Sequence, residues 1–474
     1  MSDSTGFWTT LLIISDWAIR FVMLPIVPTR RSPEAAKGWL LFIFFLPWVG
    51  LLLYLLIGRP RLPRWRIERR DRYIDLLGPI RLRMQTLRVA APDVDPQYQP
   101  SVRLAADLGL LDNLGGNAVE LLTDYGATIH RIAADIDAAR DHAHLCFYIF
   151  GDDARSAAVI DALGRAAARG VTCRVLVDAF GSRPSLRTLL PKLRSLGIAV
   201  RVALPVRFGR KTARFDLRNH RKIVVIDGRV GYTGSQNMVS SDFKRGMTYS
   251  ELMVRLEGPS VLQLQAVFGS DWLVESGEFI GEHAFPQPVT AGRTPAQILP
   301  NGPSSSTQRA HRMVINLIYS ATQRVVVTTP YFIPSQSLHD AMETAVHRGA
   351  EVHLIVDDHV DQFFVGNAQR SYYESLLLAG VRIHAYTEAF LHAKSVSIDG
   401  QVAWIGSCNL DMRSFELNEE IVALFFDQAI ARQLVALEER YMRGSHRITL
   451  DEWRRRPFAL ELTQNLARLV SPLL

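Results

Sequence analysis

Cysteine and lysine are both scarce in this chain. Three cysteines occur among the 474 residues, Cys146, Cys173 and Cys408, and none forms a C-x-x-C pair. Their odd number and wide spacing exclude a disulfide framework and a cysteine-based zinc site, so we expect three buried thiols in a reducing compartment. Lysine supplies only six of the 54 basic side chains, so a lysine inside a motif is informative.

Acidic residues are also in deficit, and the formal net charge is +7. A basic surface suits nucleic acid and anionic lipid equally well, so charge excludes neither class of partner. Hydrophobic residues make up 48% of the chain and charged residues 21%, which is a globular balance that leans toward the membrane. The length is sufficient for two or three domains.

Charge is absent from residues 39–57, an apolar run of 19 residues that is long enough to cross a bilayer. Trp39 and Tyr54 lie toward its ends, as interfacial aromatic residues do. Residues 7–28 are a weaker candidate, because Asp16 and Arg20 interrupt them, although these charges stand four apart and can face each other on a helix. A cleaved signal peptide fits poorly, because no positive charge begins the chain. We therefore predict a transmembrane helical hairpin over residues 1–57.

Residues 58–100 are interpreted as a basic juxtamembrane linker, with arginines at positions 59, 61, 64, 66, 69, 70 and 72. The positive-inside rule keeps this flank, and the large domain after it, in the cytoplasm. The basic turn at Arg30, Arg31 and Lys37 weakens that prediction. We expect the arginine run also to hold the domain against anionic headgroups, which makes the chain a multi-pass protein of the bacterial inner membrane.

The remaining sequence is a duplication. Strand-like residues 144–150 and 173–181 flank a helical pattern at 152–170, and strand-like residues 323–334 and 352–358 flank another at 337–349. This alternation indicates α/β layers. The segment RNHRKIVVIDGRVGYTGSQN at 218–237 recurs as FLHAKSVSIDGQVAWIGSCN at 390–409. With a boundary in the Pro/Gly/Ser-rich stretch at 286–306, the two halves are predicted to cover residues 101–289 and 290–474.

Each half carries one H-x-K-x-x-x-x-D motif, followed by a Gly-Ser pair and an asparagine. The candidate residues are His220, Lys222, Asp227, Ser235 and Asn237 in the first half, and His392, Lys394, Asp399, Ser407 and Asn409 in the second. The motif predicts a strand, an Asp-Gly turn and a return strand. On a strand the histidine and lysine share one face, whereas the aspartate faces away, so we interpret the aspartates as turn and orientation residues.

These residue types suit phosphodiester chemistry. One histidine can attack phosphorus and form a phosphohistidine, and the other can protonate the leaving alcohol. The lysines, asparagines and serines can bind the charged oxygens, so neither a metal nor a cofactor is expected. A histidine nucleophile also needs an acidic partner to fix its tautomer. Glu251 lies 31 residues after His220 and Glu420 lies 28 after His392, and each begins a strand-like segment, so we assign them this role.

The paired motifs resemble those of the phospholipase D superfamily, over residues 101–474. The resemblance implies two phospholipase D-like α/β/α domains that form a bilobal unit with approximate twofold symmetry, with His220 as nucleophile and His392 as acid and base. The phrases YTGSQNMV (232–239), TTPYFIP (328–334), GSCNLDMRSFELNEE (406–420) and the terminal SPLL are similar to those of bacterial cardiolipin synthases. That similarity implies transfer of a phosphatidyl group from one phosphatidylglycerol to another, with release of glycerol.

Several alternatives use the same residues. A phospholipase D-type hydrolase, a transphosphatidylase with other donor lipids and a nuclease all fit the motifs. The membrane segment and the lack of a clear series of stacking aromatics argue against nucleic acid as a partner. An inactive membrane scaffold predicts loss of one motif, and both are intact. We expect phosphatidylglycerol and other anionic lipids as partners, gathered by basic residues before the first motif, namely Arg207, Arg210, Lys211, Arg214 and Arg218. The oligomeric state stays open.

Overall fold

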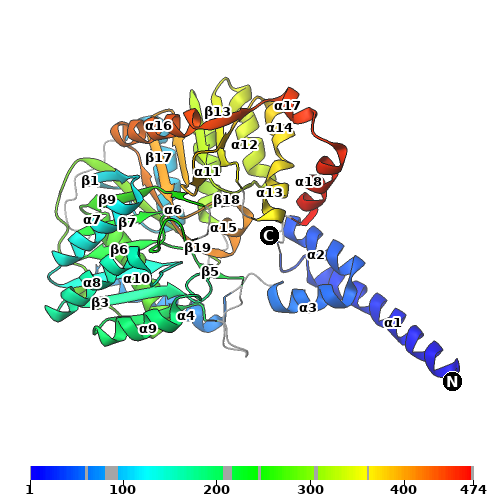
Figure 1. Cartoon of the computed structure of the whole chain (residues 1–474), viewed down its shortest axis with the longest axis horizontal. Coiled ribbons are helices and arrows are strands. Elements are labelled where there is room, and N and C mark those ends of the chain that lie inside the picture. Colours follow the sequence, from blue (N-terminus) through cyan, green and yellow to red (C-terminus); the bar gives the residue numbers. More distant parts are fainter. Residues whose placement is uncertain are drawn as a thin grey trace.

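The structure is a computed structural model that describes residues 2–31, 33–58, 62–80, 94–205, 216–243, 247–303, 308–359 and 362–470. Figure 1 shows two α/β lobes side by side, with the N-terminal helices projecting away from them. Some residues singled out by the sequence lie outside this set, namely Arg59, Arg61, Arg207, Arg210, Lys211, Arg214, residues 304–306 and the terminal SPLL.

Each lobe is an α/β/α unit, as the sequence predicts. The first contains β1 (Leu114–Leu122), β2 (His142–Phe147), β3 (Thr172–Asp178), β4 (Ala199–Ala203), β6 (Ile223–Ile226), β7 (Val230–Gly234), β9 (Met253–Glu257), α7 (Tyr125–Asp137), α8 (Ala154–Ala168), α9 (Leu186–Ser195) and α10 (Val261–Ser276). The second contains β10 (Thr294–Asn301), β11 (Arg324–Thr328), β13 (Glu351–Asp357), β14 (Arg382–Tyr386), β16 (Ser395–Ile398), β17 (Val402–Gly406), β19 (Asn418–Phe425), β20 (Ser445–Ile448), α11 (Arg309–Ser320), α12 (Gln336–His347), α13 (Phe363–Arg370), α14 (Tyr373–Ala379), α15 (Met412–Glu416), α16 (Gln428–Arg443), α17 (Leu450–Arg454) and α18 (Phe458–Val470).

Among the described residues, one sheet runs through both lobes. Its centre is the antiparallel pair β1–β10. On one side follow β9, β7, β6, β2, β3 and β4, and on the other β19, β17, β16, β11, β13 and β14, with β20 added at the edge. The two sides repeat the same order, which is the approximate twofold symmetry of a duplicated domain. A shared apolar core containing Phe268 of α10 and Leu434 of α16 joins the lobes.

The predicted strand 323–334 is broken in the structure. Its first part is β11, and its last part is the two-residue strand β12 (Phe332–Ile333), which pairs with β18 (Leu410–Asp411) instead of joining the main sheet. Pro330 lies at the break, where proline has no N–H to donate to a ladder. The chain therefore leaves the sheet and turns toward the junction between the lobes.

The start of the predicted first half belongs in space to the second. Helix α6 (Gln99–Gly109) packs on α11 and β10. Its Ser101 hydroxyl donates to the Asn316 side chain at 2.8 Å, and the Tyr98 hydroxyl before it donates to Asp399 at 3.1 Å. Ala105 and Tyr98 are buried in the second lobe's core. The apolar face of α6 finds its complement on the other half, so the first lobe begins only at β1.

The predicted basic linker contains a docked helix, α4 (Arg64–Leu76), which packs on α10. Arg66 is 4% exposed and makes two hydrogen bonds to Glu275, at 2.6 and 2.9 Å. Arg69 donates to the Val274 carbonyl, and Arg70 pairs with Glu419 at 2.9 Å. Arg66 is therefore buried away from lipid headgroups, contrary to expectation, whereas the half-buried Arg69 and Arg70 also bind the protein itself.

The N-terminal segment differs most from its prediction. Residues 7–28, the weaker candidate, form the long helix α1 (Ser2–Ile26), and Gly6–Ile26 is long and apolar enough to cross a membrane. Residues 39–57 are instead two short helices, α2 (Pro33–Phe45) and α3 (Pro47–Ile57). The Trp39 and Tyr54 rings, expected at opposite ends of a span, lie 5.3 Å apart.

Pro47 explains this break. A proline disfavours the helical conformation of the residue before it, and Leu46 is non-helical with φ −131° and ψ 73°. The chain then folds back so tightly that a Cβ at Gly50 would lie 2.8 Å from the Ile43 Cα. The predicted Asp16–Arg20 pair forms at 4.0 Å. Arg20 also donates to the Phe44 carbonyl at 3.0 Å, which ties α1 to the end of α2.

Candidate active site

The histidine of each motif is positioned by a strand of the other lobe. His220 follows β5 (Arg218–Asn219), which pairs in parallel with Asn418–Glu419 of β19, and the His220 N–H donates to the Glu419 carbonyl at 2.9 Å. His392 follows β15 (Phe390–Leu391), which pairs in parallel with β8 (Tyr249–Ser250), and its N–H donates to the Ser250 carbonyl at 2.8 Å. The crossing brings both motifs to the junction of the lobes.

The two glutamates contact the histidines, but with crossed partners. His220 Nδ1 lies 3.1 Å from the carboxylate of Glu420, and His392 Nδ1 lies 2.8 Å from that of Glu251. The sequence interpretation matched each histidine with the glutamate of its own half, which is wrong. The pairing is crossed because Glu420 directly follows the β19 residues that pair with β5, and Glu251 directly follows β8.

The two lysines lie inside this cluster rather than on the surface. Lys222 and Lys394 are fully buried, and each ammonium donates to the backbone carbonyl of the histidine two residues before it, at 2.7 Å for Lys222. Burial lowers the pKa of Lys222 to about 8 and that of Lys394 to about 7, although both glutamates oppose the shift. The two lysines, the two histidines and the two carboxylates therefore form one electrostatic unit.

The histidines are held neutral. Burial lowers the pKa of His392 to about 4, against the opposing charge of Glu251. Burial likewise lowers the pKa of His220, against Glu420. For both glutamates burial alone raises the pKa, but the nearby histidine and lysine charges outweigh it and leave the pKa lowered. With Nδ1 directed at a carboxylate, Nε2 of each imidazole is the nitrogen left for chemistry.

The predicted substrate-binding serines take another position. Ser407 Oγ donates to Glu420 at 2.5 Å, and the Ser235 hydroxyl helps to lower the pKa of Glu251. Both serines are completely buried, and each contacts the glutamate that holds a histidine. Asn237 Oδ1 accepts the Ile149 N–H at 3.1 Å. Asn409 Oδ1 is buried without a hydrogen-bond partner among the described residues, so it keeps a free acceptor.

Sequence similarity to known proteins extends over nearly the whole chain. The family described as cardiolipin synthase, PLD-like domain, matches residues 132–272 and 314–441, and the phospholipase D-nuclease N-terminal family matches residues 13–59. Cardiolipin synthase A of Proteus mirabilis (strain HI4320) is 35% identical over 98% of this chain and 100% of its own length. That of Serratia proteamaculans (strain 568) is 35% identical over 99% and 100%. The chain belongs to the cardiolipin synthase family.

Among solved structures, a phosphatidylserine synthase of Haemophilus influenzae Rd KW20 superposes with a TM-score of 0.58, covering 79% of this chain and all of that one. The two sequences are 14% identical, so this similarity concerns the fold alone.

Among the described residues, one group has metal-ligand geometry, namely His339, Asp340 and Glu343 on α12. It includes none of the motif residues.

The two motif aspartates do not join the cluster of histidines, lysines and glutamates in this member of the cardiolipin synthase family. They occupy the turns at the other ends of β6 and β16, with φ of 53° for Asp227 and 52° for Asp399. Asp227 accepts the backbone N–H groups of residues 140–142, at 2.8 to 2.9 Å. Asp399 accepts those of residues 322–324, at 2.7 to 2.8 Å. Each carboxylate therefore fastens the hairpin to the start of the neighbouring strand, β2 or β11.

Asp399→Ala is expected to lower the free energy of unfolding by about 3 kcal/mol, because charge-assisted bonds to three backbone donors are lost together. The protein that stays folded should keep its activity within about tenfold. Urea unfolding monitored by circular dichroism, with activity measured per folded molecule, checks this prediction. Loss of activity at unchanged stability would instead place Asp399 in the chemistry.

Aromatic side chains near the histidines were missed by the sequence interpretation. The Tyr148 ring lies 4.8 Å from His220 and 5.6 Å from the Lys222 ammonium, and the Tyr249 ring lies 5.4 Å from His392. Tyr148 follows β2, and Tyr331 follows the equivalent strand β11. A tyrosine just after the equivalent strand in both halves was the available signal. Arg218, expected to gather headgroups, is buried against Asp178.

Proposed function

We propose that this chain is a phosphatidyltransferase that makes cardiolipin from two molecules of phosphatidylglycerol. The observation that carries the proposal is one buried site in which each half supplies a histidine and a lysine, and each histidine takes a carboxylate from the other half. Family membership over the whole length supports transfer over the hydrolase and nuclease alternatives.

In the first half-reaction, His220 Nε2 attacks the phosphorus of one phosphatidylglycerol, and the bond from phosphorus to the headgroup glycerol oxygen breaks. His392, which takes up a proton when the phosphodiester binds, donates that proton from Nε2 to the oxygen, and glycerol leaves. In the second, His392 takes the proton from a headgroup hydroxyl of the other phosphatidylglycerol. The resulting alkoxide attacks phosphorus, cardiolipin forms and His220 is regenerated. One phosphodiester replaces another, so no nucleotide is consumed.

Lys222 and Lys394 provide the charge that this transfer needs. Both ammonium groups are buried next to a histidine carbonyl, where a low dielectric strengthens their attraction for the phosphoryl oxygens. Asn409 has a free buried acceptor for a headgroup hydroxyl. Water must be kept from the phosphohistidine, or phosphatidic acid would form.

The direct test supplies purified protein with phosphatidylglycerol vesicles in the presence of EDTA, and identifies products by mass spectrometry. We expect cardiolipin and an equal amount of free glycerol. Phosphatidic acid alone would overturn transferase activity in favour of a hydrolase. Adding phosphatidylethanolamine in a second reaction tests whether other lipids serve as donors.

Binding of a phosphodiester should take up protons. Without ligand, His392 titrates near pH 4 and Lys394 near pH 7, so at pH 7.5 the first is neutral and the second is mostly neutral. A bound anion favours the charged form of both groups and raises both pKa values. At pH 7.5 we expect uptake of on the order of one to two protons per site. Titration calorimetry of a phosphonate analogue in buffers of different ionisation enthalpy measures it, and buffer-independent heats would contradict it.

We further propose that the chain sits in the bacterial inner membrane with its lobes in the cytoplasm, held by one crossing rather than two. Among the helices that the structure describes, only α1 is long and apolar enough to span, and α2 and α3 fold back on each other. The basic residues at 30, 31 and 37 then lie on the same side as the later arginines, which satisfies the positive-inside rule without exception.

Helix α18 adds an exposed apolar stripe suited to the bilayer interface, at Phe458, Leu462, Leu466 and Leu469.

This topology places the start of α1 on the non-cytoplasmic side. A reporter active only in the cytoplasm should be silent when fused at the N-terminus and active when inserted after residue 62. Membrane-impermeant labelling, in whole cells, of a cysteine introduced at Ser2, which precedes the spanning residues Gly6–Ile26, provides an independent measurement. Two crossings, as the sequence alone predicts, would put the N-terminal reporter in the cytoplasm.

A further inference from the structure

A cavity of about 450 Å³ lies behind the first catalytic histidine. It is bounded by α4, α10, the loop after α6 and the end of β10. Its walls are apolar, from Ile74, Leu77, Leu110, Leu262 and Phe285. Arg221 and Glu419 line it, whereas their neighbours His220, Lys222 and Glu420 face the active site. The cavity and the active site therefore lie on opposite faces of β19 and of the segment that joins β5 to β6.

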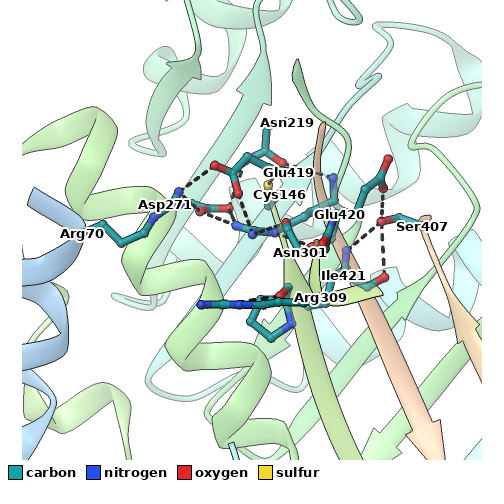
Figure 2. Close-up of polar contacts among 12 residues, drawn as sticks. Arg70, Cys146, Asn219, Asp271, Asn301, Arg309, Ser407, Glu419, Glu420 and Ile421 are labelled. Atoms are coloured by element: carbon teal, nitrogen blue, oxygen red, sulfur yellow. Dashed lines mark hydrogen bonds and ion pairs between the residues drawn. The ribbon is translucent and has the colours of Figure 1, made fainter. Parts of the chain in front are cut away.

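One end of this cavity is a buried ionic network, shown in Figure 2. Arg221 binds Asp271 at 2.5 Å and Glu419 at 2.8 Å, and Arg70 pairs with Glu419 at 2.9 Å. Arg221 stands between the histidine and lysine of the first motif, but the equivalent residue of the second motif is Ala393. The network is therefore not part of the duplicated catalytic machinery.

Arg309 lines the same end without a carboxylate partner. Among the described residues no acid lies within ion-pair distance of it, its Nε has no hydrogen-bond partner, and its Nη1 reaches only the Pro300 carbonyl at 3.5 Å. Burial lowers the pKa of Arg309, and the like charges of Arg70 and Arg221 lower it further. Among the described residues, three guanidinium groups lie with the buried carboxylates Asp271 and Glu419 at this end, and the exposed Asp112 also lines the cavity. Because an arginine stays charged in proteins, Arg309 leaves a positive charge at this end of the cavity that one more anion can neutralise.

We propose that this cavity binds an anionic amphiphile, with a carboxylate or phosphate at Arg309 and one alkyl chain along the apolar walls. The volume lies within the range of pockets that hold drug-sized ligands, roughly 300–1,000 Å³. Ile74 and Leu110 are 40% and 47% exposed at its wall, which lets the chain enter from solvent or membrane. A polar head alone would leave the walls wet, and a chain alone would leave Arg309 unpaired.

The bound ligand acts on the catalytic strand. Arg221 Nε donates to the Glu420 carbonyl at 2.9 Å, and Glu420 holds His220. An anion at Arg309 changes the charge balance on Arg221 and Glu419, and that change reaches His220 through one residue. This regulatory consequence rests on the proposed function, because it is measured as phosphatidyl transfer. Binding of the ligand in the cavity does not depend on the proposed function.

Thermal unfolding of the full chain in dodecyl maltoside, followed with four additives, tests the proposal. The additives are dodecanoate, dodecyl phosphate, inorganic phosphate and dodecanol. We expect dodecanoate and dodecyl phosphate to stabilise the protein at concentrations at least tenfold below those at which phosphate or dodecanol acts. Equal stabilisation by phosphate alone would mean an anion site without a chain, and no stabilisation by dodecanoate would overturn the proposal.

Arg309→Gln should remove the effect of dodecanoate, whereas Arg312→Gln, at an exposed position on the same helix, should keep it. Without ligand, Arg309→Gln should unfold at the same or a higher temperature, because it removes an uncompensated charge. Retained stabilisation in Arg309→Gln would overturn the site. A failure of the proposed function is distinguishable, since it would appear as absence of cardiolipin while dodecanoate still stabilises the protein.

Discussion

His220→Ala should abolish both phosphatidyl transfer and the covalent intermediate, whereas His392→Ala should abolish transfer but still form the intermediate with an activated donor. The first substitution removes the attacking nitrogen, and the second removes the proton that glycerol needs to leave. A positioned acid or base contributes about 10²- to 10⁴-fold, so both variants should fall by at least about 10²-fold with phosphatidylglycerol.

The distinguishing experiment uses a nitrophenyl ester of phosphatidic acid, whose leaving group departs without protonation. His392→Ala should release a burst of nitrophenol equal to the enzyme present and accumulate phosphohistidine, detectable by mass spectrometry at the peptide containing His220. His220→Ala should give neither. His347→Ala, at an exposed position on α12, is the control for an unspecific effect of losing an imidazole. A burst from His220→Ala with modified His392 would exchange the two roles.

Glu420→Gln is expected to impair His220, in the other half of the chain, and to leave His392 unchanged. The carboxylate 3.1 Å from His220 Nδ1 is the charge that opposes the lowering of the pKa of that histidine by burial. Without it, the pKa of His220 should fall further and the ring should lose its fixed tautomer. Transfer should then decrease by about 10²- to 10⁴-fold.

Glu251→Gln is the matched variant, and it should act on His392 alone. Nuclear magnetic resonance titration of the two imidazoles in each variant separates the effects, because the crossed arrangement predicts which signal moves. With the activated donor, Glu420→Gln should reduce the burst rate, whereas Glu251→Gln should leave it nearly normal. If Glu251→Gln shifted the His220 signal and Glu420→Gln did not, the glutamates would act within their own halves.

The sequence was sufficient for the duplicated α/β architecture and for the motif residues, because strand and helix periodicities and a long internal repeat are local signals. It also predicted the Asp-Gly turns, and Asp227 and Asp399 indeed adopt positive φ there. The crossed glutamates could not be predicted. They depend on the two-residue strands β5, β8 and β15, which pair with β19 or with each other, bury no periodic pattern of their own and join residues far apart in the chain.

Other differences have equally specific causes. Pro47 is present in the sequence, but the apolar composition of residues 39–57 led to the prediction of one continuous helix. Composition does not show that the chain reverses direction at Leu46 and Pro47. The docking of α6 on the second lobe depends on the complementary face of α11, which spacing along one helix does not reveal. Arg66 and Arg70 were interpreted as surface charges because their partners, Glu275 and Glu419, are distant in sequence.

The crossed histidine–glutamate pairs also bear on how such a chain can arise and change. A single half holds a histidine without its carboxylate and a carboxylate without its histidine, so an ancestor of one half could work only as a symmetric pair of identical subunits. In that pair any mutation would have altered both arms of the site at once. After fusion into one chain, the residues that each half contributes to the site could mutate independently. The Arg221 network, which has Ala393 at its counterpart, is a present trace of that freedom.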